Sequence, residues 1–187
     1  MKKKIFLPIL TAILATNFSC ELANVYRPTE VESANILESV QKIFLPVAYE
    51  QKIFGSKYTV IENIDTTSNN GLKISGTYKG GTEPAKDDEY VAILDITVTA
   101  DKLEIKENDI TFIDGSLDFY TTLVTEKITI KYQGELSATY KNKEIRIALN
   151  ITAEINKKDN TMKASGTYNI NSVEYNYAYD GDGPLKD

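Results

Sequence analysis

The chain has 187 residues, with 21 basic and 27 acidic side chains, a formal net charge of −6, one cysteine and no histidine. The missing histidine excludes Ser-His and Cys-His nucleophile pairs and imidazole metal ligands. A single cysteine excludes an intrachain disulfide and a thiolate metal site. The length fits one domain that buries roughly two-thirds of its unfolded surface, so we expect stability to come from hydrophobic burial.

The N-terminal segment has the parts of an export signal. Three lysines at positions 2–4 precede an apolar stretch at 5–15, and Cys20 follows shortly afterwards. This order is typical of a secretory signal peptide, and the apolar stretch is shorter than the about 20 residues that a membrane-spanning helix needs. We therefore predict a signal peptide over residues 1–19 and a tether over residues 20–28.

With the cysteine at its end, this segment resembles a bacterial lipoprotein signal peptide, in which the cysteine is acylated and becomes the first residue of the mature chain. Ser19 matches the small residue that precedes the cysteine in a lipobox, whereas Asn17 stands where leucine is usual. The resemblance implies lipidation of Cys20 and a lipid-anchored protein of the bacterial cell envelope, at the outer membrane. The alternative is an ordinary signal that is cleaved nearby and leaves a free thiol. Signal removal would leave a net charge of −9, which argues against nucleic-acid partners and against docking on anionic lipid.

One amphipathic helix is predicted over residues 29–45. Thr29 fits as its N-cap, and Glu32 stands three residues later as the capping-box partner. Pro46 is expected to end or kink the helix. The apolar residues recur at steps of three and four and form a stripe that needs a partner surface: Ala34, Leu37, Val40, Phe44 and Val47.

Beyond residue 57 the apolar period changes to two, with long alternating runs at 90–98, 128–140 and 145–155. We predict eight or nine strands in an antiparallel meander with one apolar and one polar face, in a single domain over 29–187. The sequences at 72–78 and 162–168 share five residues, which suggests similar hairpins at opposite ends of the meander. Turns rich in Gly, Asn, Asp, Lys and Ser are predicted at 68–71, 80–81, 100–101, 141–142, 157–160 and 171–172.

Four glycines lie inside the predicted strands, in phase with apolar residues: Gly76, Gly115 (with Ile113, Leu117 and Phe119), Gly134 and Gly166. The strand around Gly134 would run about 45 Å at roughly 3.3 Å per residue, which is too long to stay flat, and a strand bends sharply at glycine. We therefore predict a mainly-β fold: a curved sheet or partly closed barrel with the helix on its concave side. A ligand site is expected in this concavity, at the four glycines together with Tyr78 and Tyr168. The alternative is that the glycines make room for the helix.

Two further features each have a binding interpretation and a structural one. Tyr175, Tyr177 and Tyr179 alternate along the last predicted strand and form either a stacking platform for a sugar or protein partner, or a half-buried edge face. The acidic loops at 87–89 and 180–183 offer the oxygen ligands that calcium prefers, but they lack EF-hand spacing. Solvated acidic turns are the alternative.

No motif for catalysis stands out. Glu135 and Glu154 fall on polar strand faces, and nothing in the sequence brings them to the roughly 5 to 10 Å that a glycosidase pair needs. We predict a noncatalytic protein, without cofactor or metal, that binds an apolar small molecule or lipid in the concave interior. One alternative is a surface or structural lipoprotein that contacts another protein through its loops and polar sheet face. The other is a small outer-membrane β-barrel, which has the same alternating strands.

Overall fold

The computed structural model describes residues 25–49, 60–82, 90–124 and 126–182, which form one helix and nine strands. The predicted signal peptide, Cys20 and the acidic loop at 87–89 lie outside the described residues. The elements are α2 (Glu30–Tyr49), β1 (Val60–Thr67), β2 (Lys73–Thr82), β3 (Tyr90–Ala100), β4 (Ile105–Glu107), β5 (Ile110–Val124), β6 (Lys127–Tyr140), β7 (Lys143–Asn156), β8 (Thr161–Ile170) and β9 (Val173–Asp182).

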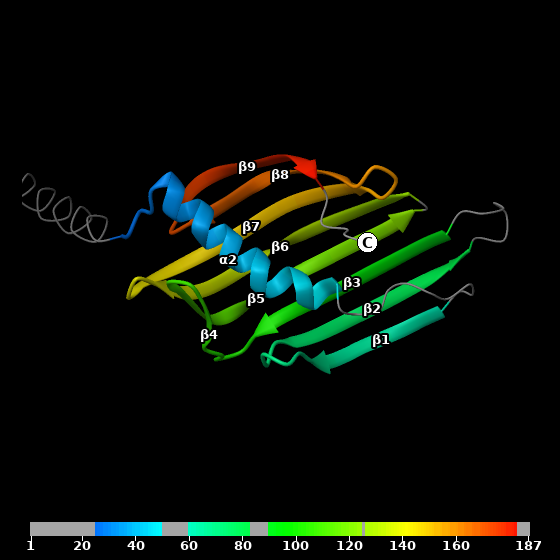
Figure 1. Cartoon of the computed structure of the whole chain (residues 1–187). Helices are drawn as coiled ribbons and strands as arrows, with labels where there is room; N and C mark the ends of the chain where they lie inside the picture. The colour runs from blue at the N-terminus through cyan, green and yellow to red at the C-terminus, as the bar shows by residue number, and fades with distance from the viewer. Residues whose placement is uncertain (1–24, 50–59, 83–89, 125, 183–187) are drawn as a thin grey trace, which may run out of the picture.

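The nine strands form a single antiparallel meander. Their order is β1-β2-β3-β5-β6-β7-β8-β9, and the short β4 pairs with the first residues of β5, beyond the end of β3. The sheet is open and curved, with β1 and β9 at its two edges (Figure 1). This confirms the predicted mainly-β fold in its open form.

Helix α2 crosses the concave face of the sheet diagonally, from β8 and β9 at its start towards β3 at its end (Figure 1). Phe44 meets Phe112 of β5 edge to face, with ring centroids 5.6 Å apart. Ala34, which was predicted to lie in the buried stripe, is exposed on the flank of the helix. The side chains that the helix buries against the sheet are 0–8% exposed: Ile36, Leu37, Val40, Ile43, Phe44 and Val47.

All four strand glycines lie inside strands and on the concave face. Gly134 has a φ of +147°, and a Cβ atom there would overlap the carbonyl oxygen of Ser116 and lie 3.0 Å from Leu117 Cα. Residue 134 therefore has to be a glycine for β5 and β6 to approach as they do. Gly76, Gly115 and Gly166 have the same type of close contact with a neighbouring strand.

The structure corrects three details of the predicted elements. α2 continues through Pro46 to Tyr49, so the predicted end at residue 45 is wrong. The turn predicted at 80–81 is also wrong, because Gly80 pairs with Ala92 inside β2. A bulge between Phe112 and Asp114 shifts the register, so Phe112 and not Ile113 joins the buried face of Gly115. The other predicted turns fall between strands, except that Ala100 is still the last residue of β3.

Candidate functional site

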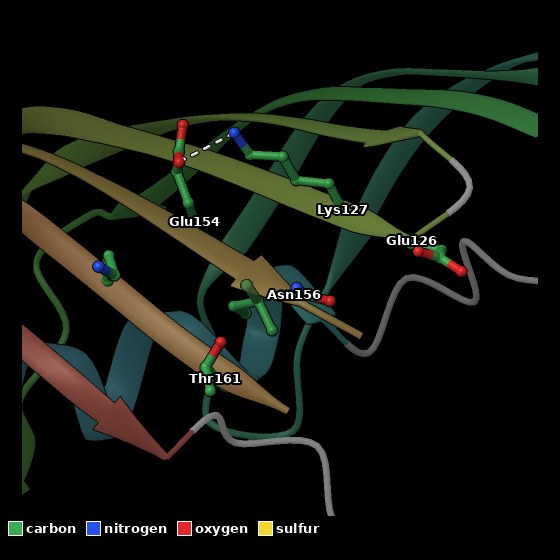
Figure 2. A pocket seen from close by; sticks show the side chains of 7 residues that line it. Glu126, Lys127, Glu154, Asn156 and Thr161 are labelled. Carbon is green, nitrogen blue, oxygen red and sulfur yellow. Dashed lines mark ion pairs between the residues drawn. The ribbon is translucent and has the colours of Figure 1, made fainter. Parts of the chain in front are cut away.

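Two of the hollows on the described surface are candidate sites. The first, of about 400 Å³, lies at the ends of β6, β7 and β8 (Figure 2). There Lys127 Nζ lies 2.9 Å from Glu154 Oε2, and both side chains are at least half exposed. An ion pair this exposed is typically worth about 0–1 kcal/mol, and the hollow has no buried polar group that would recognise a ligand.

The second hollow is a groove of about 630 Å³ between α2 and the strands β8 and β9. It exists because the helix crosses the sheet diagonally and diverges from β9 (Figure 1). The helix contributes Glu30, Ser33, Ala34, Leu37, Glu38 and Gln41 to its lining. The strands contribute Tyr168, Glu174, Tyr175, Asn176, Tyr177 and Ala178. We call this hollow the tyrosine groove.

Stacked aromatic rings form the sheet side of the tyrosine groove. Tyr168 and Tyr175 occupy paired positions on β8 and β9, and their ring centroids lie 5.2 Å apart with the planes 20° from parallel. The Tyr168 hydroxyl lies 3.0 Å from Ser33 Oγ, and the Tyr175 hydroxyl donates to the Pro28 carbonyl at 2.8 Å. Burial raises the pKa of Tyr175, and the negative charge around it adds to the shift. The Tyr175 ring is therefore neutral, and these hydrogen bonds hold both rings in place before any ligand arrives.

Side-chain hydrogen bonds also hold the helix side of the groove. Ser33 Oγ donates to the Glu30 carbonyl at 2.8 Å and is itself buried. Gln41 Nε2 donates to the Tyr132 hydroxyl of β6 at 2.8 Å. Leu37 is buried, whereas Ala34 is exposed and leaves the groove open towards solvent.

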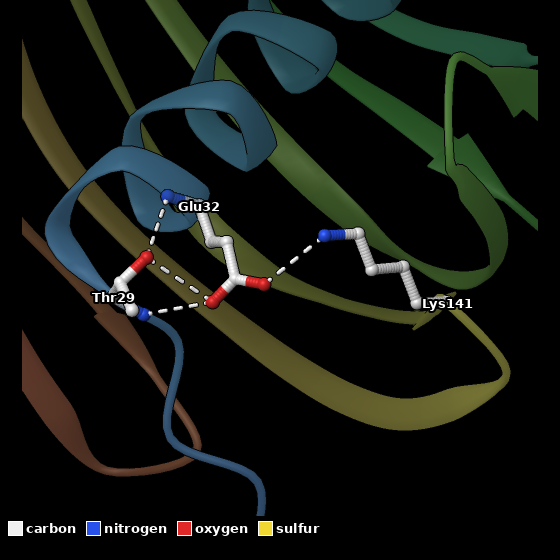
Figure 3. Close-up of polar contacts among 3 residues, drawn as sticks. All are labelled: Thr29, Glu32 and Lys141. Carbon is white, nitrogen blue, oxygen red and sulfur yellow. Dashed lines mark hydrogen bonds and ion pairs between the residues drawn. The ribbon is translucent and has the colours of Figure 1, made fainter.

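A polar cluster next to the groove fixes where α2 begins (Figure 3). The predicted capping box is confirmed: Glu32 N donates to Thr29 Oγ1 at 3.2 Å, and Thr29 N donates to Glu32 Oε2 at 3.0 Å. Lys141, in the turn between β6 and β7, donates to Glu32 Oε1 at 3.1 Å. The hydrogen bond from Thr29, together with the one from Lys141, lowers the pKa of Glu32 to about 2.

Tyr26 packs beside this cluster. Its ring lies 4.6 Å from Lys143 Nζ and 6.1 Å from the ring of Tyr140. Burial raises the pKa of Tyr26 to about 12, and the Glu32 carboxylate adds to the shift although it makes no well-aligned hydrogen bond with Tyr26 Oη. The chain just before α2 is thus packed against the turn between β6 and β7.

The structure places only one of the residues predicted to bind a ligand at the groove. Tyr168 lines the tyrosine groove, but Tyr78 and the four glycines do not. Of the predicted tyrosine row, Tyr175 and Tyr177 line the groove, whereas Tyr179 lies beyond it, 39% exposed, and donates to the Asp182 carbonyl at 3.0 Å. Sequence reasoning missed the helix residues of the groove, because no sequence signal indicates the angle at which a helix crosses a sheet.

The structure does not bring together the carboxylates that the sequence offered as catalytic or calcium-binding candidates. Glu135 lies opposite Ala148 on the polar face, and Glu154 is paired with Lys127. Asp180 lies 3.2 Å from Lys163. Across the described ranges, no group of three His, Cys, Asp or Glu residues is placed to hold a metal ion. No helix within those ranges is long and apolar enough to cross a membrane.

Comparison with known proteins gives no match: no family model, no curated protein and no solved structure matches the chain. What the tyrosine groove can bind therefore has to follow from its own residues. These offer aromatic faces, three aliphatic side chains, a few hydroxyl and amide groups and three carboxylates. Such a lining suits noncovalent binding of a partly apolar molecule.

Proposed function

We propose that the protein is a noncatalytic binding module of the bacterial cell envelope, anchored through acylated Cys20, that takes an apolar small molecule or lipid chain in the tyrosine groove. The observation that carries the proposal is the half-buried ring of Tyr175, which stacks on the buried ring of Tyr168 and lines a groove of about 630 Å³. Because α2 covers the concave interior, the groove at its flank is a better candidate than the glycine row.

The dimensions and stiffness of the groove support this proposal. Pockets for small molecules commonly measure about 300–1,000 Å³ and combine apolar walls with a few polar groups. Covering the half-buried rings of Tyr175 and Tyr177 with an apolar chain would contribute roughly 25 cal/mol for each Å² removed from water. The hydrogen bonds of Ser33, Tyr175 and Gln41 hold the walls in the free protein, so little ordering cost is left for the binding step.

A titration with octan-1-ol tests the proposal. The chain has 12 tyrosines and no tryptophan, so tyrosine emission can report ligand binding. Ala34→Phe adds a ring inside the groove and should weaken binding at least tenfold. Val31→Phe is the matched control, since Val31 is 70% exposed on α2 and does not line the groove. Absence of saturable binding, or equal loss in both variants with folding retained, would refute the proposal.

The alternative of a lipoprotein that binds another protein also has an observation in its favour. The described part of the chain has no element covering the convex face, where Tyr120 is 43% and Val124 is 37% exposed. A photo-cross-linking residue placed at 120, compared with one placed at 34, distinguishes the two proposals in cells. Protein adducts formed only from position 120 would favour the alternative.

A further inference from the structure

We infer that the ligand of the tyrosine groove is an amphiphilic organic cation, with an apolar chain along the rings and an alkylated ammonium group at the rim. This inference rests on the groove function proposed above and adds the charge of the ligand. Three of the described lining residues are carboxylates, Glu30, Glu38 and Glu174, and none of them is basic. The groove is therefore acidic on both its helix side and its strand side.

The rim carboxylates are largely free to meet a ligand charge. Within the described residues, Glu30 and Glu174 form no ion pair. Glu38 lies 2.8 Å from Lys42, but both side chains are more than half exposed and Lys42 does not line the groove. A cation at the rim would thus gain attraction from two carboxylates that have no ion-pair partner in the described part of the chain.

The aromatic walls favour the same charge. The face of a tyrosine ring is negative, so it attracts a cation that lies above it. An alkylated ammonium suits such a wall better than a primary ammonium, because it is less strongly hydrated and its methyl groups pack against the rings. The net negative charge of the whole chain raises the concentration of cations near its surface.

One feature nearby would favour an anion, namely the N-terminus of α2. Its free backbone donors lie at the positive end of the helix dipole. However, the capping box of Thr29 and Glu32 already occupies this end, and Glu32 is also bound to Lys141 (Figure 3). A fatty-acid carboxylate entering the groove would therefore meet like charges at the rim and no free donor cluster.

Three probes with the same chain and different head groups test the inference: octyltrimethylammonium, octan-1-ol and octanoate. They are titrated below their micelle concentrations, at pH 7 and low salt, with tyrosine emission as the readout. We expect the ammonium probe to bind more tightly than the alcohol, and at least tenfold more tightly than octanoate. Raising the salt concentration should reduce this preference.

Charge-neutralising variants locate the effect. Glu30→Gln combined with Glu174→Gln should reduce the ammonium-to-octanoate ratio at least threefold. Glu62→Gln combined with Glu144→Gln removes the same charge from exposed positions outside the groove and should leave the ratio nearly unchanged. Binding of octan-1-ol should be similar in both double variants.

The outcomes separate the two proposals. If all three probes bind equally, the cation inference is wrong and the groove function stands. If the two double variants lower the ratio equally, the preference comes from overall charge and the inference is again wrong. If no probe binds, the groove function itself is refuted, and the inference with it.

Discussion

The hydroxyl oxygen of Ser33 lies 3.0 Å from that of Tyr168, although the two residues are 135 positions apart in the chain. Both side chains are buried, so the contact joins the first turn of α2 to β8 where the tyrosine groove begins. It sets the distance between the helix and the stacked rings. The width of the groove therefore depends on a pair of small polar groups.

Ser33→Ala should lower the free energy of unfolding by about 1–2 kcal/mol, because it leaves the buried Tyr168 hydroxyl without this partner. Urea unfolding followed by circular dichroism measures the loss. A double-mutant cycle with Tyr168→Phe is the control, and the combined cost should be smaller than the sum of the single costs. Strictly additive costs would show that the contact contributes no coupling energy.

Gly134→Ala should destabilise the protein by about 1–3 kcal/mol or more, since it places a Cβ against the β5 backbone at a φ of +147°. Thermal unfolding measures the effect. Gly181→Ala is the matched control, because a Cβ there meets only the ring and hydroxyl of Tyr179, at 3.0 Å and beyond, which can move aside. Equal stability of the Gly134→Ala variant and the parent protein would contradict the predicted close approach of β5 and β6.

Glu32→Gln should destabilise the protein at neutral pH and progressively less in acid. The pKa of Glu32 is about 2 in the folded protein, below its ordinary value of 4.5. The carboxylate therefore stabilises the fold fully above about pH 4.5, and this contribution is lost as the pH falls towards 2. Urea unfolding at pH 7 and pH 3 should show a smaller difference between variant and parent at the lower pH. A difference that stays constant would exclude Glu32 as the group responsible, and Glu144→Gln controls for the loss of an exposed carboxylate.

Cys20→Ser should move the protein from the membrane fraction to the soluble fraction of the producing cells. The proposed acyl chains would contribute about 0.8 kcal/mol for each buried methylene, and several chains make a stable anchor. Fractionation followed by immunoblotting, together with mass spectrometry of the N-terminus, measures the change. Membrane retention of the variant would contradict lipidation.

The local features of the fold could be predicted because neighbouring residues decide them. Thr29 and Glu32 lie within one helical turn of each other, so the start of α2 could be recognised from the chain alone. The alternations predicted over 128–140 and 145–155 indicate burial of one sheet face, and every apolar position in both runs is buried apart from Gly134.

The predicted helix end and the predicted turn at 80–81 were wrong because contacts with distant residues outweigh the local conformational preferences of proline and glycine. Pro46 removes one helix hydrogen bond, but the burial of Phe44 and Val47 on either side keeps the helix intact. Gly80 and Gly81 have the composition of a turn, yet pairing with β1 and β3 keeps Gly80 extended. The helix side of the tyrosine groove could not be predicted, since it depends on where α2 lies over β8 and β9.

The first described residues of the chain are hydrogen-bonded to the last hairpin of the sheet. Asn171 Nδ2 donates to the Tyr26 carbonyl at 3.0 Å, and Tyr175 donates to the Pro28 carbonyl at 2.8 Å, so two backbone carbonyls that lead into α2 find their hydrogen-bond donors in the last hairpin. A chain delivered N-terminus first must leave these two carbonyls without their donors until that hairpin has arrived, and such long-range pairing slows folding. Deleting β8 and β9 should therefore release the start of α2, while Phe44 can still pack against Phe112 of β5.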